Sequence, residues 1–135
     1  MTEALYQQAI KDLAAAAHGA GRLAAVDAQA VRDNPLCGDR IALEIGVTAG
    51  RVGELAHRTT GCLLCRAAAS ALADAAIGLD VAGAAALADG VAAMLGQGGE
   101  PPLPVLAAFR PVAAHRRRHD CVMLPFRALV QALGG

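Results

Sequence analysis

The chain has few aromatic residues and no excess charge of either sign, and these two gaps exclude several classes of protein. Aromatic side chains make up 2% of the 135 residues, and hydrophobic residues make up 56%, many of them alanine. Alanine fills little volume, so we expect a tight but shallow core that gains stability from a metal or a partner. The 12 Lys and Arg residues balance 12 Asp and Glu residues. Without a net positive charge, the chain lacks the basic face that bulk nucleic-acid binding requires.

Long uncharged stretches are also missing, although the mean hydropathy is +0.43. Charged residues interrupt the apolar segments well before the roughly twenty residues that a membrane-spanning helix needs. The N-terminal segment MTEALYQQAIKDL is amphipathic and carries both signs of charge, which is not the pattern of a signal peptide. The sequence therefore predicts a cytoplasmic protein of one domain, residues 1–135, that binds neither membrane nor nucleic acid.

Hydrophobic periodicity and turn residues predict strands followed by helices, which indicates the α+β class. We expect an N-terminal helix over 3–17, capped by Thr2 and ended by Gly19 and Gly21. The later elements, in order, are an apolar stretch 23–26, a turn 33–35, a strand 40–47, a return strand 51–58, helices 62–77 and 81–95, a loop 96–104, a short helix or turn 105–109 and a last helix 121–133. Pro125 fits this last helix only within its first turn.

Four cysteines stand out in a chain with no export signal: Cys37, Cys62, Cys65 and Cys121. In a reducing compartment such thiols favour metal binding or sulfur chemistry over disulfides, although each could also be a small buried apolar residue. Three of them lie at the ends of predicted elements, where side chains can converge: Cys37 and Asp39 at a turn, Cys62 at a strand-to-helix junction, and Cys121 near the start of the last helix. Zinc and iron–sulfur sites draw thiolates from such positions, but these spacings match no standard zinc finger.

Three sequence blocks carry a more specific signal. They are Asn34-Pro-Leu-Cys-Gly-Asp39, Thr60-Gly-Cys-Leu-Leu-Cys-Arg-Ala-Ala-Ala-Ser70 and Arg118-His-Asp-Cys-Val-Met-Leu-Pro-Phe-Arg-Ala-Leu129. In this order they resemble the iron–sulfur scaffold family of SufU, IscU and the N-terminal domain of NifU, over nearly the whole chain. The resemblance implies a small antiparallel three-stranded sheet packed against N-terminal and C-terminal helices. The segment of about 78–110 is similar to the insertion of SufU-type members, and Arg118 resembles the arginine that they carry before the last cysteine.

The resemblance also implies a ligand set and a function. Cys37, Asp39, Cys62 and Cys121 match the residues that hold Zn²⁺ or a transient [2Fe–2S] cluster in that family. The implied function is a scaffold, a zinc-dependent acceptor of sulfur from a SufS-like cysteine desulfurase, or both, acting with other proteins rather than as an independent enzyme. Downstream apo iron–sulfur proteins are the implied recipients. A carboxylate is a harder and more easily displaced ligand than a thiolate, which suits a site that must release its cargo.

Several residues depart from the family pattern. Cys65 creates a Cys62-x-x-Cys65 pair, which leaves open a dithiol redox protein, and a purely structural zinc domain that binds a partner is a third interpretation. Cys65 itself is expected to be a buried structural thiol. His57 and His115, in slots where the family tends to have Phe, are expected to be partly buried and hydrogen-bonded. Gly38 is expected to need a positive φ.

Cys121 is the predicted sulfur-receiving thiol. The helix start and the neighbouring arginines 116–118 should favour its thiolate, and Arg118 with the long inserted segment should make it the most accessible of the thiols. His119 is a candidate exchanging ligand. The basic run 115–119 is expected to be a solvated face, or else a docking patch for an acidic partner.

Overall fold

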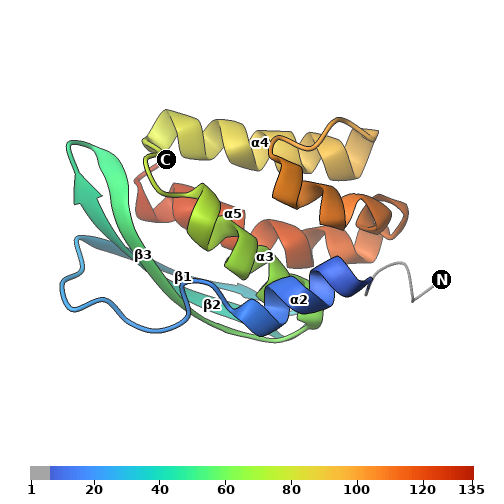
Figure 1. Cartoon of the computed structure of the whole chain (residues 1–135), viewed down its shortest axis with the longest axis horizontal. Coiled ribbons are helices and arrows are strands. Elements are labelled where there is room, and N and C mark those ends of the chain that lie inside the picture. Colours follow the sequence, from blue (N-terminus) through green and yellow to red (C-terminus); the bar gives the residue numbers. More distant parts are fainter. Residues whose placement is uncertain (1–6) are drawn as a thin grey trace.

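The computed structural model describes residues 7–135 and shows an antiparallel sheet covered on one face by helices (Figure 1). The elements in chain order are α2 (Gln8–Ala16), β1 (Ala28–Asn34), β2 (Asp39–Thr48), β3 (Arg51–Thr60), α3 (Leu63–Ala75), α4 (Val81–Gln97), the 3-10 helices η1 (Pro104–Ala114) and η2 (Arg116–Arg118), and α5 (His119–Ala132). The expected α+β class with a three-stranded antiparallel sheet is confirmed.

The sheet has the strand order β1-β2-β3. Alternate residues of the central strand, Ile41, Leu43 and Ile45, are at most 1% exposed and point toward the helices, as the alternating pattern predicts. At one end of the sheet, Asn34 pairs with Asp39 across the β1–β2 turn. This end carries the first predicted ligands.

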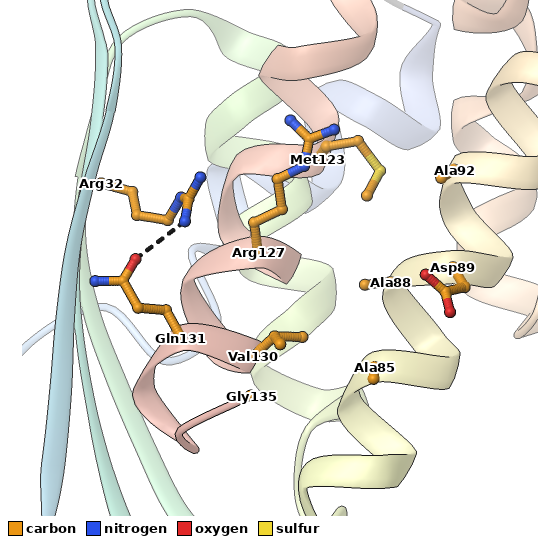
Figure 2. Close-up of a pocket in the computed structure, with 10 residues that line it drawn as sticks. All are labelled: Arg32, Ala85, Ala88, Asp89, Ala92, Met123, Arg127, Val130, Gln131 and Gly135. Carbon is orange, nitrogen blue, oxygen red and sulfur yellow. Dashed lines mark hydrogen bonds between the residues drawn. The ribbon is translucent and has the colours of Figure 1, made fainter.

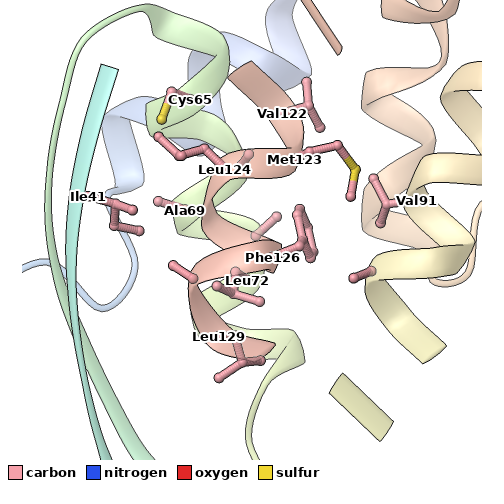
Figure 3. Packing of buried hydrophobic residues seen from close by; sticks show 14 of the residues in the cluster. Ile41, Cys65, Ala69, Leu72, Val91, Val122, Met123, Leu124, Phe126 and Leu129 are labelled. Carbon is pink, nitrogen blue, oxygen red and sulfur yellow. The ribbon is translucent and has the colours of Figure 1, made fainter. Parts of the chain in front are cut away.

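The helices form two layers on the sheet. α3 and α5 lie side by side against the strands, and α4 lies on the outer side of α5 (Figure 1). The buried side chains of α3 are mostly alanines, so α3 and α5 approach closely, whereas Phe126 on α5 lies on the side that faces Val91 of α4 (Figure 3). Alanine is therefore the commonest residue of the buried core, where it packs among larger leucine, isoleucine, valine and methionine side chains.

The structure corrects four details of the predicted elements. β1 occupies 28–34, where no strand was predicted, and Asp33 and Asn34, which were expected in a turn, belong to it because they pair with Arg40 and Asp39. The turn is consequently Pro35–Gly38. The first helix ends at Ala16, and the cap in the left-handed region is Ala17 at φ 47° rather than a glycine. The short helix near 105–109 extends from Pro104 to Ala114.

Pro125 lies in the second turn of α5, because the helix begins at His119 rather than at Cys121. Thr2, the predicted N-cap of the first helix, lies outside the described residues. Within residues 7–135, no helix combines the length and the apolar character needed to cross a membrane.

Candidate metal centre

The β1–β2 turn places Cys37 and Asp39 on either side of a glycine. Gly38 has φ +70°, in the left-handed region where glycine carries no steric penalty, as the sequence predicts. The backbone N–H of Cys37 donates to the carbonyl of Asn34 at 3.2 Å and closes the turn. Cys37 is half-buried and Asp39 is 1% exposed, so the turn points a carboxylate inward beside a thiol at the surface.

The junction between β3 and α3 is pressed against Asp39. Asp39 Oδ1 accepts a hydrogen bond from the backbone N–H of Cys62 at 2.8 Å. A Cβ at Gly61 would lie 2.7 Å from the Cα of Asp39, and Gly61 has φ +127°, so only glycine fits there. Cys62 is the N-cap of α3, and its sulfur accepts the N–H of Cys65 at 3.5 Å. The buried carboxylate of Asp39 thus fixes the position of Cys62 at the start of α3.

Cys121 reaches the same point from the first turn of α5. Its Sγ lies 3.2 Å from Cys37 Sγ, and the amide of Asn34 donates to it at 3.8 Å. Ligand atoms of Cys37, Asp39 and Cys121 all lie within 4.8 Å of one another. Residues 84 positions apart in the sequence are therefore brought into sulfur–sulfur contact.

Cys62 lies beside this group of three. Its Sγ is 3.7 Å from Asp39 Oδ2. A hydrogen bond from the Cys121 thiol lowers the pKa of Cys62 to about 7, against the opposing effect of burial. The same hydrogen bond, together with burial, raises the pKa of Cys121. The proximity of the two sulfurs therefore favours a thiolate at Cys62 over one at Cys121.

The donor chemistry of these four residues fits a thiolate-bound metal. Three sulfurs and one carboxylate oxygen give the four ligands that zinc prefers in tetrahedral geometry. Two thiolates on one tetrahedral zinc lie about 3.8 Å apart, given Zn–S bonds of about 2.3 Å. The 3.2 Å separation of Cys37 and Cys121 is close to that value and would need only a small outward movement.

The structure contradicts the expectation that Cys121 is the most accessible thiol. Cys121 is 0% exposed, because the first turn of α5 is packed under the β1–β2 turn, whereas Cys37 and Cys62 are half-buried. The expected stabilisation of the Cys121 thiolate by the helix start is also outweighed in the metal-free protein, where its hydrogen bonds and burial keep it protonated.

Cys65 is buried as expected. It is 0% exposed and packs in the core near the start of α3 (Figure 3). Burial raises the pKa of its thiol, which keeps it protonated and poorly reactive. This burial disfavours the dithiol redox interpretation, because a redox-active pair needs an accessible thiolate.

The ring nitrogens of two of the histidines, His57 and His119, contact other groups of the protein. His57 is 4% exposed, with Nδ1 2.9 Å from Thr59 Oγ1 and Nε2 2.8 Å from the carbonyl of His18, which confirms a buried, hydrogen-bonded histidine. His115 is half-buried, as expected. His119 Nε2 lies 3.1 Å from the carbonyls of Val112 and Ala113 in η1, so an exchange of ligands through this nitrogen would first have to break those contacts.

A hollow of about 620 Å³ opens beside the thiols, and sequence reasoning identified only part of its lining. It is lined by Leu36, Cys37, Arg116, Arg117, Arg118 and Asp120, and we call it the basic cleft. The run of three arginines was the feature of the sequence that indicated this part of the lining. The contribution of Leu36, which is 90% exposed, depends on where the β1–β2 turn falls.

A second hollow, of about 610 Å³, lies between α4, α5 and β1 (Figure 2). Alanines of α4 and the side chain of Met123 line its apolar part, and Arg32 donates to Gln131 at 3.0 Å along its edge. None of the four thiols lines it, so it takes no part in the candidate metal centre.

Fold and site together define a class: a small α+β domain that gathers thiols and one buried carboxylate from three separate element ends. The family model for the NifU-like N terminal domain matches residues 5–132. This chain therefore belongs to the NifU-like N-terminal domain family.

Individual relatives agree with this assignment. The chain is 32% identical over 133 residues to the iron-sulfur cluster assembly scaffold protein IscU of Streptococcus pyogenes serotype M1, a match that covers 96% of this chain and 82% of that protein. The crystal structure of a nitrogen-fixing NifU-like protein (N-terminal) from Brucella abortus superposes with a TM-score of 0.89 at 28% identity, over 98% of this chain and 94% of the other.

A third comparison supports the fold alone, because its identity is 21%. It is the iron-sulfur cluster assembly scaffold protein for the SUF system from Fervidobacterium islandicum AW-1, with a TM-score of 0.85 over 98% of this chain and 99% of the other.

Proposed function

We propose that this chain is an iron–sulfur cluster assembly scaffold that holds Zn²⁺ or a transient [2Fe–2S] cluster through Cys37, Asp39, Cys62 and Cys121. The observation that carries the proposal is the convergence of Cys37, Asp39 and Cys121 within 4.8 Å, with Cys62 hydrogen-bonded to two of them. Membership of the family and the 32% identity to a named scaffold protein support it.

The ligands divide the work between binding and release. Cys37, Cys62 and Cys121 are soft donors that supply most of the affinity for zinc or iron, and a bound metal supplies the charge that keeps them deprotonated. Asp39 is a harder donor, and its Oδ1 is already engaged by the N–H of Cys62 at 2.8 Å. When Asp39 leaves the metal, this hydrogen bond keeps the buried carboxylate satisfied, so the proposed release costs less than exposing a bare charge would.

The sulfur in this scheme comes from a cysteine desulfurase of the SufS type. A thiolate of this chain attacks the outer sulfur of the enzyme's cysteine persulfide. A new S–S bond forms here, the old S–S bond breaks, and the enzyme's cysteine leaves as a thiolate. We keep Cys121 as the proposed acceptor. Because it is buried, the incoming sulfur would pass Cys37, whose Sγ lies 3.2 Å away and which lines the basic cleft.

Three further features belong to the same proposal. Residues of about 78–110, which include α4 and the start of η1, would form the inserted segment of a SufU-type member within a single domain of residues 1–135. Arg118 and His119 would assist near the site. The scaffold would work in the cytoplasm and pass its cluster to apo iron–sulfur proteins; four free cysteines suit a reducing compartment.

Persulfide mapping tests the assignment of roles. The protein is incubated with a cysteine desulfurase and cysteine, and persulfides are located by mass spectrometry in the wild type, Cys121→Ala and the control Cys65→Ala. We expect label on Cys121 and loss of desulfurase stimulation in Cys121→Ala alone. Stimulation retained in Cys121→Ala, with label on Cys65, would show that the role of acceptor is assigned wrongly.

A further inference from the structure

The basic cleft opens beside the metal centre and is built from two segments that are 80 residues apart in the sequence. We propose that it docks an acidic segment of the sulfur-donating protein, an inference that rests on the proposed function. The occupant is a stretch of polypeptide that carries Asp or Glu side chains next to the sulfur it delivers.

The charge of the cleft calls for an anionic occupant. Three consecutive arginines, Arg116–Arg118, line it together with one carboxylate, Asp120. That carboxylate is already engaged, because Asp120 Oδ1 accepts a hydrogen bond from Arg127 at 2.9 Å. Arg116 and Arg117 are exposed, and within residues 7–135 neither has an ion pair. The cleft is therefore a local concentration of positive charge on a chain whose formal net charge is zero.

An apolar side chain stands at the rim of the same cleft. Leu36 is 90% exposed, the highest value among the large hydrophobic residues that are exposed in the described chain. It lies in the turn directly before Cys37. A large apolar side chain held out beside charged groups is suited to contact a protein surface, where such anchors contribute much of the binding energy.

The cleft leads to the thiol that a delivered sulfur would meet first. Of the four cysteines, Cys37 lines the cleft, and its Sγ touches Cys121 at 3.2 Å. A segment bound along the arginines would thus bring its reactive sulfur to the exposed side of the ligand cluster. The partner segment would therefore bind in the same cleft through which its sulfur reaches Cys37.

Protein fits this cleft better than nucleic acid does. The volume of about 620 Å³ lies within the range of sites that enclose a compact ligand or a few residues of a partner. Leu36 offers an apolar contact that a phosphate backbone would not use. A nucleic acid would need an extended basic face, whereas the positive charge here is confined to three neighbouring residues.

Charge-matched variants test the proposal. The affinity for the cysteine desulfurase of the same organism is measured at low and high salt for the wild type and for Arg116→Glu/Arg117→Glu. The control is Arg22→Glu/Arg51→Glu, which changes the net charge equally at two exposed positions that do not line the cleft, Arg51 lying at the β2–β3 turn on the other end of the sheet. Arg116→Lys/Arg117→Lys keeps the charge, and Leu36→Ser removes the apolar anchor. Zinc content is measured for every variant.

We expect the glutamate pair to weaken binding by about tenfold or more and to flatten its salt dependence, since steering by charge is screened by salt. The lysine pair should bind within about threefold of the wild type and the control pair within about twofold, and Leu36→Ser should weaken binding at all salt concentrations. Zinc content should be unchanged throughout.

The contrary results separate this proposal from the proposed function. If the wild type binds zinc and stimulates the desulfurase but the glutamate pair binds as well as the control pair, docking in the basic cleft is wrong and the scaffold function stands. If the wild type neither binds nor stimulates the desulfurase, both proposals fail together. Micromolar binding of a single-stranded oligonucleotide, lost in the glutamate pair while desulfurase binding is retained, would assign the cleft to nucleic acid instead.

Discussion

The thiol end of the molecule and its helical layer are built from opposite kinds of residue. The thiol end consists of turns, in which Gly38 and Gly61 have positive φ. Its buried carboxylate, Asp39, accepts a hydrogen bond from the backbone N–H of Cys62. The helical layer is packed from alanines together with buried leucine, valine, methionine and phenylalanine side chains (Figure 3). One region is positioned by backbone geometry and the other by close packing, so substitutions should separate metal binding from stability.

The largest effect on stability is expected in the helical layer. Phe126→Ala removes a large side chain that is 1% exposed and leaves a cavity in the close-packed helical layer. We expect the free energy of unfolding to fall by about 3–5 kcal/mol, measured by denaturant titration. Ile77→Ala, at a position 51% exposed, is the control and should cost less than about 1 kcal/mol. Equal losses in the two variants would contradict the importance of this packing.

The thiol end should show the reverse behaviour. Cys37→Ser replaces a soft thiolate with a hydroxyl, and we expect zinc affinity to fall by more than about a hundredfold, since outer-shell partners alone account for about 10–100-fold. The free energy of unfolding of the chelated protein should change by less than about 1 kcal/mol, because Cys37 lies in an exposed turn. Cys65→Ala, in the core, is the control that keeps zinc affinity. A metal titration followed by chelation and denaturant unfolding measures both quantities.

A subtler change at the same end should slow release rather than prevent binding. Asp39→Ala removes the hard ligand, and we expect a reconstituted cluster to be retained longer, by about a few-fold in the decay of visible absorbance. Asp120→Ala removes an exposed carboxylate nearby that pairs with Arg127, and its decay should match that of the wild type. Equal decay for the wild type and Asp39→Ala would remove the argument that Asp39 serves release.

The smallest expected effect is a pH dependence of stability that comes from neither of the two regions compared above. Burial lowers the pKa of His57 below 6.5, and the hydrogen bond to the carbonyl of His18 only partly opposes this. Below pH 6.5 the unfolded chain therefore binds a proton that the folded chain does not, and stability falls as pH falls until the folded-state pKa is reached.

We expect His57→Gln to show a shallower decrease of the free energy of unfolding below pH 6.5 than the wild type. Denaturant titrations at a series of pH values measure both slopes. His115→Gln, at a half-buried position, is the control. Identical slopes for the wild type and His57→Gln would rule His57 out as the source of the dependence.

Much of the fold was predictable because its signals are local. The alternation of Ile41, Leu43 and Ile45 gave the central strand, and the alanine-rich runs bounded by glycines gave α3 and α4. β1 was not predicted because its residue types do not alternate: its inward positions include Arg32 and Asn34, whereas Val31 faces outward, although the burial itself alternates along the strand. The α5 start was misplaced by two residues because no capping side chain marks it: Arg118, at the N-cap position, makes no side-chain cap hydrogen bond.

The candidate site was likewise predictable in part. Its residue types and their places at element ends could be inferred from the sequence, as could the burial of Cys65. The accessibility of the thiols could not, because whether Cys37 or Cys121 faces outward depends on how the β1–β2 turn lies over α5. That relation joins residues 84 positions apart, and no local pattern encodes it.

Pro125 interrupts the backbone hydrogen bonds of α5 close to the candidate metal centre. It follows Cys121 by four residues, so a proline ring stands where a backbone amide would otherwise hold the carbonyl of Cys121. The turn that carries this cysteine therefore has one hydrogen bond fewer than the rest of α5. Local opening there should require less free energy than opening near Leu129, and amide hydrogen exchange would report it as faster exchange at the start of the helix. This local flexibility would let the sulfur of Cys121 shift by fractions of an ångström when a metal or cluster binds and leaves, while the packed helical layer behind it stays in place.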